Sequence, residues 1–378
     1  MKVVVIIPTY NEKENIKKLI PILEDEIFPQ VKNHDMNILV ADDNSPDKTA
    51  DEVRELMKKW KNIDVNIGEK KGLGAAYVRA MSYAIDKMGA DVVFEMDADL
   101  SHDPKKIPAF MEKIDKGYDF VIGTRYSDGG SIPGNWGLIR KLYSVMGNII
   151  VRSVLMRFAI HDWTGGYRAL RKEVFLKEKS ELTAFMGYTF QVSFLHKAVR
   201  DGFKVAEVPI NFTDRTLGRS KIAASEYIFD LLYYVFTARF KELAFGPFGK
   251  FLVVGGTGFV LQAVILKILV EQMSVSPTVA NLIGAAVAIF SNYNLNNFWT
   301  FKSEKISGFG KYLWKLLNFY ATSAIGVILI QTGVIYLGDY FLGRQYYFIY
   351  FIIGTAILLV WNFTMYRFVI WRKKPQDK

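Results

Sequence analysis

Phe94-Glu95-Met96-Asp97-Ala98-Asp99-Leu100-Ser101 ends a strand-like run with two carboxylates one residue apart. In a strand, residues i and i+2 point to the same side, so Asp97 and Asp99 can converge on one hard divalent cation. Such a cation keeps coordination places for phosphate oxygens, which makes a nucleotide diphosphate the obvious ligand. An exposed turn that carries two acids is the alternative explanation, and the flanking sequence decides between the two.

The same order of strand, polar loop and helix recurs along the first half of the chain. Apolar and β-branched runs predict strands at residues 3–7, 37–41, 64–67, 92–96 and 118–123. Helical runs at 15–27 and 47–60 separate the first of them. This alternation predicts a doubly wound α/β domain whose ligands bind at the carboxyl ends of the strands, where Tyr10, Asp43 and Asp97 lie.

The composition adds a membrane part to this domain. The 378 residues are 51% hydrophobic and 15% aromatic, which is too apolar for an ordinary soluble enzyme. The surplus begins near residue 248, so we expect a soluble domain followed by a membrane domain. The net charge of +10 comes without any nucleic-acid-binding motif, so we expect no nucleic-acid partner. Anionic lipid headgroups and phosphorylated substrates are the expected partners.

The apolar runs predict four membrane spans, at residues 251–270, 278–299, 313–337 and 347–370. The connection 302–315 and the C-terminal tail are rich in basic residues, whereas the other two connections carry at most one. By the positive-inside rule, the protein is then a multi-pass protein of the cell membrane, with the catalytic domain and both termini in the cytoplasm.

Residues 222–247 are predicted to form amphipathic helices at the membrane interface. Their apolar face, at helical spacing, consists of Tyr227, Ile228, Leu231, Leu232, Val235 and Phe236. A helix packed on the soluble core is the alternative. The second span carries five asparagines, Asn281, Asn292, Asn294, Asn296 and Asn297. Apart from those at helix ends, they should face other helices or a polar path, because lipid cannot satisfy their hydrogen bonds.

Six motifs lie in order between residues 3 and 221. They are Pro8-Thr9-Tyr10-Asn11-Glu12, Ala41-Asp42-Asp43-Asn44-Ser45-Pro46-Asp47, Gly72-Leu73-Gly74, Met96-Asp97-Ala98-Asp99-Leu100-Ser101, Gly123-Thr124-Arg125-Tyr126 and Asp214-Arg215 through Ser220-Lys221. Together they resemble the dolichol-phosphate mannose synthases, which are inverting glycosyltransferases of the GT-A fold. The membrane part looks like the four-helix domain fused to the synthase in some prokaryotic members. The resemblance implies a GT-A catalytic domain over residues 1–221, interfacial helices over 222–247 and a transmembrane domain over 248–378.

The resemblance also implies the residues that bind the donor, GDP-mannose. These are Pro8, Tyr10, Glu12, Asp42, Asp43, Asp97, Ala98, Asp99, Arg215 and Lys221. Strand-end capping is the alternative role for one of the two acids Asp42 and Asp43. Asp97 and Asp99 would hold Mg²⁺ or Mn²⁺ against the diphosphate. Ser101 departs from relatives that carry a metal-reaching glutamine there, so water would take that coordination place.

The acceptor residues implied by the resemblance are Arg125, Arg140 and Ser144, which would bind the phosphate of dolichyl or polyprenyl phosphate. For Arg140 a solvated helix face is the alternative. No dedicated general base is recognisable. None is needed, because the second pKa of a phosphate monoester is about 6 and the acceptor is already an anion. Asp97, Asp99 and Arg125 are therefore the expected catalytic residues.

The expected reaction is an inverting transfer of mannose, which yields GDP and dolichyl β-D-mannosyl phosphate, a lipid-linked donor for protein glycosylation and glycolipid synthesis. A UDP-glucose-dependent polyprenyl-phosphate glucosyltransferase is the nearest alternative. A processive polysaccharide synthase is disfavoured, because Phe236-Thr237-Ala238-Arg239-Phe240 lacks the Gln-x-x-Arg-Trp pattern of that class. From a different class, the chain could be a lipid-linked sugar flippase whose first half only delivers cargo.

Overall fold

The computed structural model describes residues 1–182, 188–214, 224–275, 277–343 and 346–372. The chain divides into two compact units, Met1–Ala238 and Arg239–Lys378. The boundary lies within the helix α8 (Ala224–Phe245), which begins in the segment predicted to be interfacial.

The first unit is built on a seven-stranded sheet in the order β3-β2-β1-β4-β6-β5-β7. The strands are β1 (Lys2–Thr9), β2 (Asp35–Asp42), β3 (Ile63–Ile67), β4 (Val92–Glu95), β5 (Phe120–Thr124), β6 (Arg168–Arg171) and β7 (Val205–Pro209). Neighbouring strands are parallel except at β6, which is antiparallel to both β4 and β5. The five predicted strands correspond to β1 to β5, so the predicted α/β architecture is present with one reversed strand.

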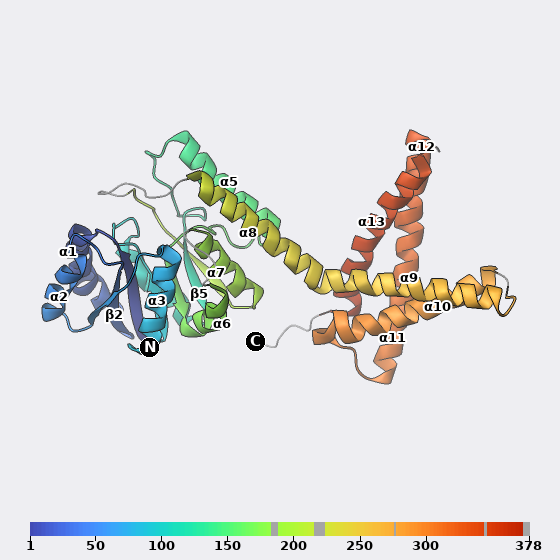
Figure 1. The fold of residues 1–378 in the computed structure, drawn as a ribbon, viewed down its shortest axis with the longest axis horizontal. Coiled ribbons are helices and arrows are strands. Elements are labelled where there is room, and N and C mark those ends of the chain that lie inside the picture. The colour runs from blue at the N-terminus through green and yellow to red at the C-terminus, as the bar shows by residue number, and fades with distance from the viewer. Residues whose placement is uncertain (183–187, 215–223, 276, 344–345, 373–378) are drawn as a thin grey trace. The chain divides into compact units, whose positions relative to one another are not determined.

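Helices cover both faces of this sheet (Figure 1). They are α1 (Lys13–Pro21, continued by the π-helical η1, Ile22–Ile27), α2 (Thr49–Lys59), α3 (Leu73–Asp86), α4 (Ile107–Asp115), α5 (Leu138–Leu155), α6 (Lys172–Leu182) and α7 (Tyr188–Arg200), with short 3₁₀ turns η2 (Phe28–Gln30) and η3 (Pro104–Lys106). Val3, Val5 and Ile7 of β1 enter one core cluster, and Val4 and Ile6 enter the other. Full burial of such a side chain contributes roughly 1.5–3 kcal/mol, which explains why β1 is apolar on both faces.

On the helix α8, the apolar face that the sequence assigns to the membrane interface is partly buried and partly exposed. Leu231 and Val235 are buried in the core of the first unit, as the alternative of a core helix requires. Phe236 is exposed, and it lies on one side of the helix with the exposed Phe229 and Tyr233, which are seven and three residues before it. The interfacial role of α8 therefore stays a prediction that rests on these exposed aromatic residues.

The second unit is helical. Its elements are α9 (Pro247–Glu271), α10 (Pro277–Leu295), η4 (Asn296–Thr300), η5 (Lys302–Glu304), α11 (Phe309–Ile325), η6 (Gly326–Gln331), α12 (Thr332–Leu342), α13 (Tyr347–Met365) and η8 (Tyr366–Ile370). Within the described residues, two helical stretches are long and apolar enough to cross a membrane, Pro247–Glu271 and Ile352–Ile370. They correspond to the first and fourth predicted spans. The second and third coincide with helices but do not meet this test, so the count of four spans remains a prediction.

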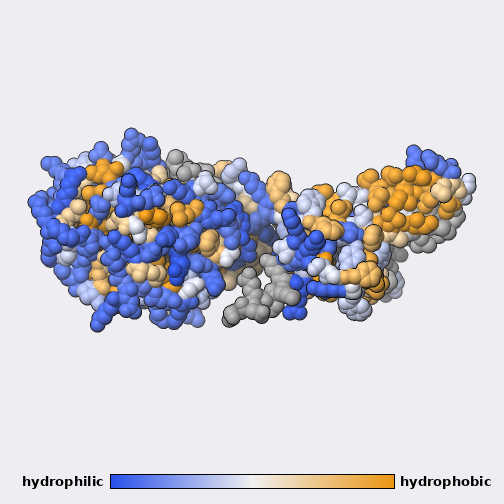
Figure 2. All heavy atoms as spheres, turned by 90° about the horizontal axis from the view of Figure 1, so that it is seen from below, coloured by the Kyte–Doolittle hydropathy of each residue, from blue (hydrophilic) through white to orange (hydrophobic). Residues whose placement is uncertain are grey.

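Apolar side chains of the second unit face outward. In Figure 2 this unit carries extended hydrophobic areas, whereas the drawn face of the first unit is mostly hydrophilic. Phe259 of α9 is 73% exposed and Val360 of α13 is 57% exposed. A helix in the core of a soluble protein would bury such residues, so this exposure favours a lipid environment.

Two of the five asparagines of the second predicted span form side-chain hydrogen bonds to other segments. The Asn297 Oδ1 accepts hydrogen bonds from the Trp371 indole N–H at 2.9 Å and the Ile306 backbone N–H at 2.7 Å. The Asn294 side chain accepts one from the Tyr312 hydroxyl at 2.8 Å. These bonds satisfy amide groups that lipid would leave unpaired.

Candidate active site

The carboxyl ends of β1, β2 and β4 lie at one edge of the sheet. In the parallel register Thr9 is opposite Asp42, and Ile6 is opposite Glu95. The loops that follow these strand ends carry the residues predicted to bind the nucleotide and the metal. This is the edge where ligands bind in open α/β sheets.

The loop after β4 contains both predicted metal ligands. Asp99 is buried and accepts a hydrogen bond from the Ser101 backbone N–H at 3.1 Å. The Asp97 side chain is 32% exposed. Leu100 has a φ of +60°, a left-handed conformation that costs a non-glycine residue on the order of 1 kcal/mol. Strain of this kind gathers at ligand-binding sites, and here it shapes the turn between the acids and Ser101.

This loop fits a divalent cation whose coordination is completed by substrate. Within the described part of the chain, no group of three or more His, Cys, Asp or Glu side chains could hold a metal ion. Two carboxylates, from Asp97 and Asp99, leave most oxygen places of Mg²⁺ or Mn²⁺ to a diphosphate and water. The buried Ser101 hydroxyl has no hydrogen-bond partner among the described residues, so it is a further oxygen available in the loop.

His102 supports the loop of residues 96–101, which contains Asp97 and Asp99 and is called the metal loop below. The sequence analysis missed this role. Its Nδ1 accepts a hydrogen bond from the Asp97 backbone N–H at 3.1 Å, and its ring stacks on Tyr167 with centroids 4.8 Å apart. On β4 itself, Glu95 is fully buried. Burial raises the pKa of Glu95 to about 7, although the nearby charge of Arg168 lowers it in part. No motif marks His102, so only the fold assigns it this contact.

The two acids at the end of β2, Asp42 and Asp43, have different surroundings. The Asp42 carboxylate accepts hydrogen bonds from the Thr9 hydroxyl at 2.8 Å, and from the hydroxyl and backbone N–H of Ser45 at 2.5 Å and 2.9 Å. This is the strand-end capping expected of one member of the pair. Asp43 instead accepts a bond from Arg79 at 2.9 Å. Burial raises the pKa of Asp43, and Arg79 partly offsets this effect.

The other predicted donor residues lie around the same strand ends. Pro8 is in β1, and the Tyr10 ring that follows lies 3.6 Å from the Lys70 ammonium nitrogen, measured to the ring centroid. Glu12 accepts a hydrogen bond from the Asn15 side chain at 2.6 Å. Ala98 is buried between the two metal-loop acids. Arg215 and Lys221 lie outside the described residues.

Arg125, which follows β5, is held by a buried carboxylate. Its Nε and Nη2 donate to the two oxygens of Asp162 at 2.7 Å and 2.8 Å, and Nη2 also donates to the Thr164 hydroxyl at 2.8 Å. Burial tends to raise the pKa of Asp162, but the Arg125 charge and hydrogen bonds outweigh it, and the pKa is lowered. The guanidinium plane of Arg125 is therefore fixed by the protein before any substrate binds.

The loop that carries Asp162 is itself clamped. The Asn148 side chain of α5 accepts from the Trp163 backbone N–H at 2.7 Å and donates to Thr164 at 3.3 Å. A Cβ atom at Gly165 would lie 2.9 Å from the Gly123 carbonyl oxygen, so only glycine allows the loop to approach β5 this closely. The loop thus connects Arg125 to α5 and to the sheet.

Arg140 and Ser144 lie one turn apart on α5. The Arg140 guanidinium lies 3.9 Å from the Trp136 ring centroid and 3.3 Å from an Asp214 oxygen, with 52% of its side chain exposed. The Ser144 hydroxyl is hydrogen-bonded to the Tyr126 hydroxyl at 2.5 Å. Arg140 is thus placed to meet an anionic ligand, whereas Ser144 is bonded to the residue that follows Arg125.

Phe212, just after β7, connects the metal loop with the arginines. Its ring centroid is 6.1 Å from that of His102, 5.9 Å from that of Trp136 and 5.7 Å from the guanidinium carbon of Arg125. The guanidinium of Arg140 stacks on the ring of Trp136. The structure therefore gathers the predicted metal loop and the two predicted acceptor arginines around one aromatic residue.

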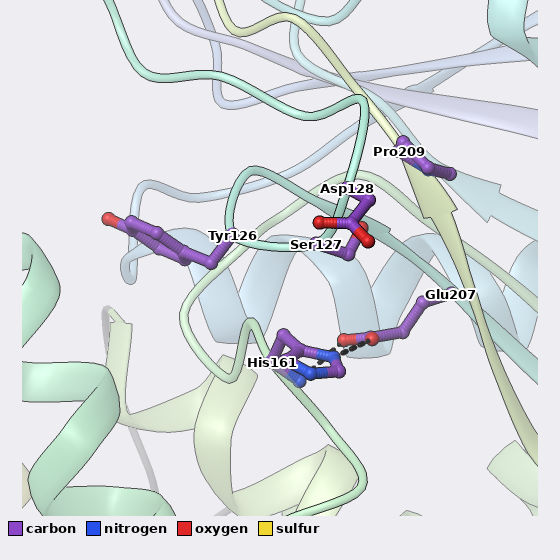
Figure 3. A pocket seen from close by; sticks show the side chains of 6 residues that line it. All are labelled: Tyr126, Ser127, Asp128, His161, Glu207 and Pro209. Carbon is purple, nitrogen blue, oxygen red and sulfur yellow. Dashed lines mark hydrogen bonds and ion pairs between the residues drawn. The ribbon is translucent and has the colours of Figure 1, made fainter.

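A surface pocket of about 340 Å³ borders the Arg125 loop (Figure 3). Its lining consists of Tyr126, Ser127, Asp128, His161, Glu207 and Pro209. Figure 3 shows His161 and Glu207 in contact at the floor of the pocket, with Asp128 on the opposite side. Of these residues, only Tyr126 belongs to a motif that the sequence analysis used.

Both halves of the chain match known protein families. The model of glycosyl transferase family 2 matches residues 4–177, and that of the GtrA/DPMS transmembrane domain matches residues 250–371. Over 372 residues the chain is 32% identical to a dolichol-phosphate mannosyltransferase of Pyrococcus furiosus, which covers 98% of this chain and 99% of that protein. The chain belongs to the dolichol-phosphate mannosyltransferase family.

Two further proteins are similar to this dolichol-phosphate mannosyltransferase family member. The chain is 41% identical over 229 residues to a polyprenol monophosphomannose synthase of Mycolicibacterium smegmatis, which covers 59% of this chain and 82% of that protein. The crystal structure of a Mycobacterium tuberculosis glucosyl-3-phosphoglycerate synthase, in complex with Mn²⁺, uridine diphosphate and phosphoglyceric acid, is 17% identical. It covers 63% of this chain and 78% of that chain, with a TM-score of 0.45.

In this dolichol-phosphate mannosyltransferase family member, the sequence analysis missed several residues that surround Arg125 or form the loop around Asp162. They are Asn148, His161, Asp162, Thr164, Glu207 and Phe212. A signal existed only for Asn148, which lies four residues after Ser144 and hence on the same helix face. The others contact Arg125 or its loop from positions distant in sequence, so local patterns do not reveal them.

The helix α5 of this dolichol-phosphate mannosyltransferase family member also presents an apolar face to solvent. Leu138 is 85% exposed, and Ile139, Leu142 and Tyr143 are exposed as well. Soluble domains rarely leave such a contiguous apolar face uncovered, and a lipid surface would cover it. Arg140 lies within this segment, between Ile139 and Leu142.

Proposed function

We propose that the protein transfers mannose from GDP-mannose to a polyprenyl phosphate such as dolichyl phosphate, with inversion at the anomeric carbon. The observation that carries the proposal is that Phe212 contacts both His102, next to the metal loop, and Arg125, and also contacts Trp136, on which Arg140 stacks. The names of the two similar proteins, a dolichol-phosphate mannosyltransferase and a polyprenol monophosphomannose synthase, support both mannose and a polyprenyl phosphate.

In the proposed reaction, a phosphate oxygen of the acceptor forms a bond to the anomeric carbon as the bond from that carbon to the GDP diphosphate breaks. Arg125 and Arg140 bind the acceptor phosphate, and Arg125 is pre-oriented by Asp162. No proton must be removed, because the acceptor is already an anion near neutral pH. Alignment and charge stabilisation are then the main contributions of the protein.

Asp97 and Asp99 are the residues that would hold Mg²⁺ or Mn²⁺ in this scheme. When bound there, a divalent cation neutralises charge on the departing diphosphate. Tyr10, Glu12 and Asp43 lie at neighbouring strand ends, where the base and ribose would bind. Asp42 shapes the loop through its bonds to Thr9 and Ser45.

The proposed location is the cell membrane, with four spans and with the catalytic unit and both termini in the cytoplasm. The match of residues 250–371 to a transmembrane domain and the two apolar helices support membrane insertion. The basic connection 302–315 and the basic tail support the orientation. Cysteines introduced singly into each connection and labelled from either side of the membrane would test it.

A transfer assay tests the donor and the acceptor together. The full-length protein receives radiolabelled GDP-mannose or UDP-glucose, one polyprenyl phosphate and Mg²⁺ or Mn²⁺, and the lipid product is identified by mass spectrometry. We expect a β-linked mannosyl phosphoryl lipid and GDP. Glucosyl transfer alone would reassign the donor, and lipid scrambling by the second unit without any transfer would favour a flippase.

The assignment of Arg140 predicts a change in lipid dependence. A charge-assisted hydrogen bond to phosphate contributes roughly 1.5–3 kcal/mol. Arg140→Ala should therefore raise the apparent KM for polyprenyl phosphate about tenfold to a hundredfold. The KM for GDP-mannose should change far less. Titrating each substrate at saturating concentrations of the other measures both constants.

Arg54→Ala is the matched control for Arg140→Ala. Arg54 has the same exposed fraction, 52%, and also pairs with an aspartate, but it lies on α2. Its replacement should leave both KM values unchanged. A rise in the KM for GDP-mannose alone in Arg140→Ala would mean that α5 serves the donor and not the acceptor.

The division of the chain predicts that a protein truncated near Pro247 still binds nucleotide. Every donor residue proposed above precedes this point, and the sheet that positions the described ones lies within Met1–Ala238. Calorimetric titration with GDP should give an affinity close to that of the full-length protein, whereas transfer to long-chain lipid should fall. Complete loss of GDP binding would refute the independence of the catalytic unit.

A further inference from the structure

Glu207 lies on the edge strand β7 and contacts the loop that orients Arg125. One of its carboxylate oxygens accepts the backbone N–H groups of His161 at 2.6 Å and Asp162 at 3.2 Å. The other is hydrogen-bonded to the His161 ring at 2.6 Å. A single side chain therefore fixes two consecutive peptide groups of the loop, as Figure 3 shows for the His161 contacts.

The contacts form a continuous chain from the sheet to the acceptor side of the site. Glu207 is in register with Ile122 of β5, three residues before Arg125. From Glu207 the chain passes through the backbone of Asp162 to its carboxylate, and from there to Nε and Nη2 of Arg125 at 2.7 Å and 2.8 Å. Glu207 lies in β7, and Arg125 directly follows β5, which pairs with β7. The loop between these two residues is therefore held at a fixed distance from the sheet.

The surroundings of Glu207 favour hydrogen bonds to backbone N–H groups over an ion pair. Its side chain is only 14% exposed. A carboxylate this buried requires hydrogen-bond donors to offset the loss of hydration. Among the described residues, its one ion-pair partner is His161, so peptide N–H groups are its main donors. An aliphatic residue at this position would leave those N–H groups unsatisfied.

We infer that Glu207 is a positioning residue for the acceptor: by clamping the loop at His161 and Asp162, it sets the plane in which Arg125 meets the polyprenyl phosphate. The inference rests on the proposed function, in which Arg125 binds the acceptor phosphate. A guanidinium forms two parallel bonds to phosphate only in a narrow range of orientations. A displacement near 1 Å is enough to cost on the order of a hundredfold in such geometry.

The test uses the full-length protein in lipid nanodiscs with a polyprenyl phosphate of defined length. Glu207→Ala should raise the apparent KM for that lipid about tenfold or more, with the KM for GDP-mannose changed less than about twofold. Glu207→Gln keeps a carbonyl oxygen for both backbone N–H groups and should stay within about threefold of the wild type. His161→Ala removes the ring but not the backbone bonds, and should also stay close to the wild type.

A double-mutant cycle separates positioning from general loop stability. When Arg125 is already alanine, Glu207→Ala should add nothing to the KM for lipid, because the group through which it acts is absent. Additive effects would overturn the inference. So would a lowered Tm with an unchanged KM for lipid, equal increases in both KM values, or failure of Glu207→Gln to restore the lipid KM.

The outcome for Arg125→Ala alone distinguishes the inference from the proposed function. If Arg125→Ala raises the KM for lipid and Glu207→Ala does not, only the inference fails. If Arg125→Ala leaves that KM unchanged, the acceptor assignment fails and the role of Glu207 falls with it. Should Glu207→Ala not fold, Glu207→Asp replaces it. This variant keeps the charge, but it is one methylene too short to reach both peptide groups and should raise the KM for lipid severalfold.

Discussion

Asp99→Asn should reduce mannosyl transfer by on the order of a hundredfold to a thousandfold, because stabilisation of a diphosphate by a bound cation contributes several kcal/mol and each 1.36 kcal/mol is a factor of ten. The amide keeps an oxygen that can accept the hydrogen bond from the Ser101 backbone N–H, so the turn should persist. What is lost is one of the two charges that hold the cation. The fold should be unchanged, as near-identical thermal unfolding would verify.

The control for Asp99→Asn is Asp103→Asn, the same change four residues further along. Asp103 caps a short 3₁₀ turn by accepting the Lys105 backbone N–H at 3.0 Å, and asparagine is an equally good cap. Asp103→Asn should therefore keep normal turnover. Initial rates across a titration of Mn²⁺ or Mg²⁺, together with calorimetry of GDP with and without the cation, would measure the effect. Full activity in excess EDTA would refute the metal-dependent mechanism.

Asp162→Ala should combine a large loss of stability with loss of turnover. It leaves the Arg125 guanidinium, whose side chain is only 10% exposed, without its carboxylate partner. Breaking a buried ion pair by removing one partner typically costs roughly 3–5 kcal/mol. In a unit of this size, that corresponds to a fall in Tm on the order of 10 °C. Turnover should fall too, because Arg125 is no longer held in one orientation.

The exposed pair of Arg54 and Asp51 is the control for Asp162→Ala. Its N–O distance, 2.6 Å, resembles the 2.7 Å of the buried pair, but both side chains are more than half exposed. Asp51→Ala should change stability by about 0–1 kcal/mol. If Asp162→Ala were as mild as Asp51→Ala, the ion pair with Arg125 would not be the contact that holds the loop.

The pH dependence of stability gives an independent check on Asp162. Its pKa in the folded protein is lowered, because Arg125 outweighs the effect of burial. A lowered pKa contributes stability that is present above the unfolded value, about 3.9, and lost as the pH falls through the folded value. The difference in Tm between the wild type and Asp162→Asn should therefore shrink as the pH falls below about 4. A difference that grows on acidification would contradict this assignment.

The sequence by itself determined the strands β1 to β5, the position of the loop with Asp97 and Asp99, and the position of the apolar half. These features are local. Val3 to Ile7 is a continuous apolar run because both faces of β1 are covered, and Asp97 and Asp99 directly follow β4. The predicted helical run 47–60 likewise corresponds to α2, Thr49–Lys59.

The tertiary structure alone decided how the surroundings of Arg125 are built. Asp162 lies 37 residues from Arg125, and Glu207 lies 45 residues from Asp162. The reversed strand β6 brings the loop before it next to β5, and no periodicity in the sequence encodes that direction. The choice between Asp42 and Asp43 as the capping acid depended in the same way on Thr9 and Arg79. Side-chain periodicity reports which face is buried, whereas the partner of a buried charge depends on which strands pair, and only the folded chain fixes that pairing.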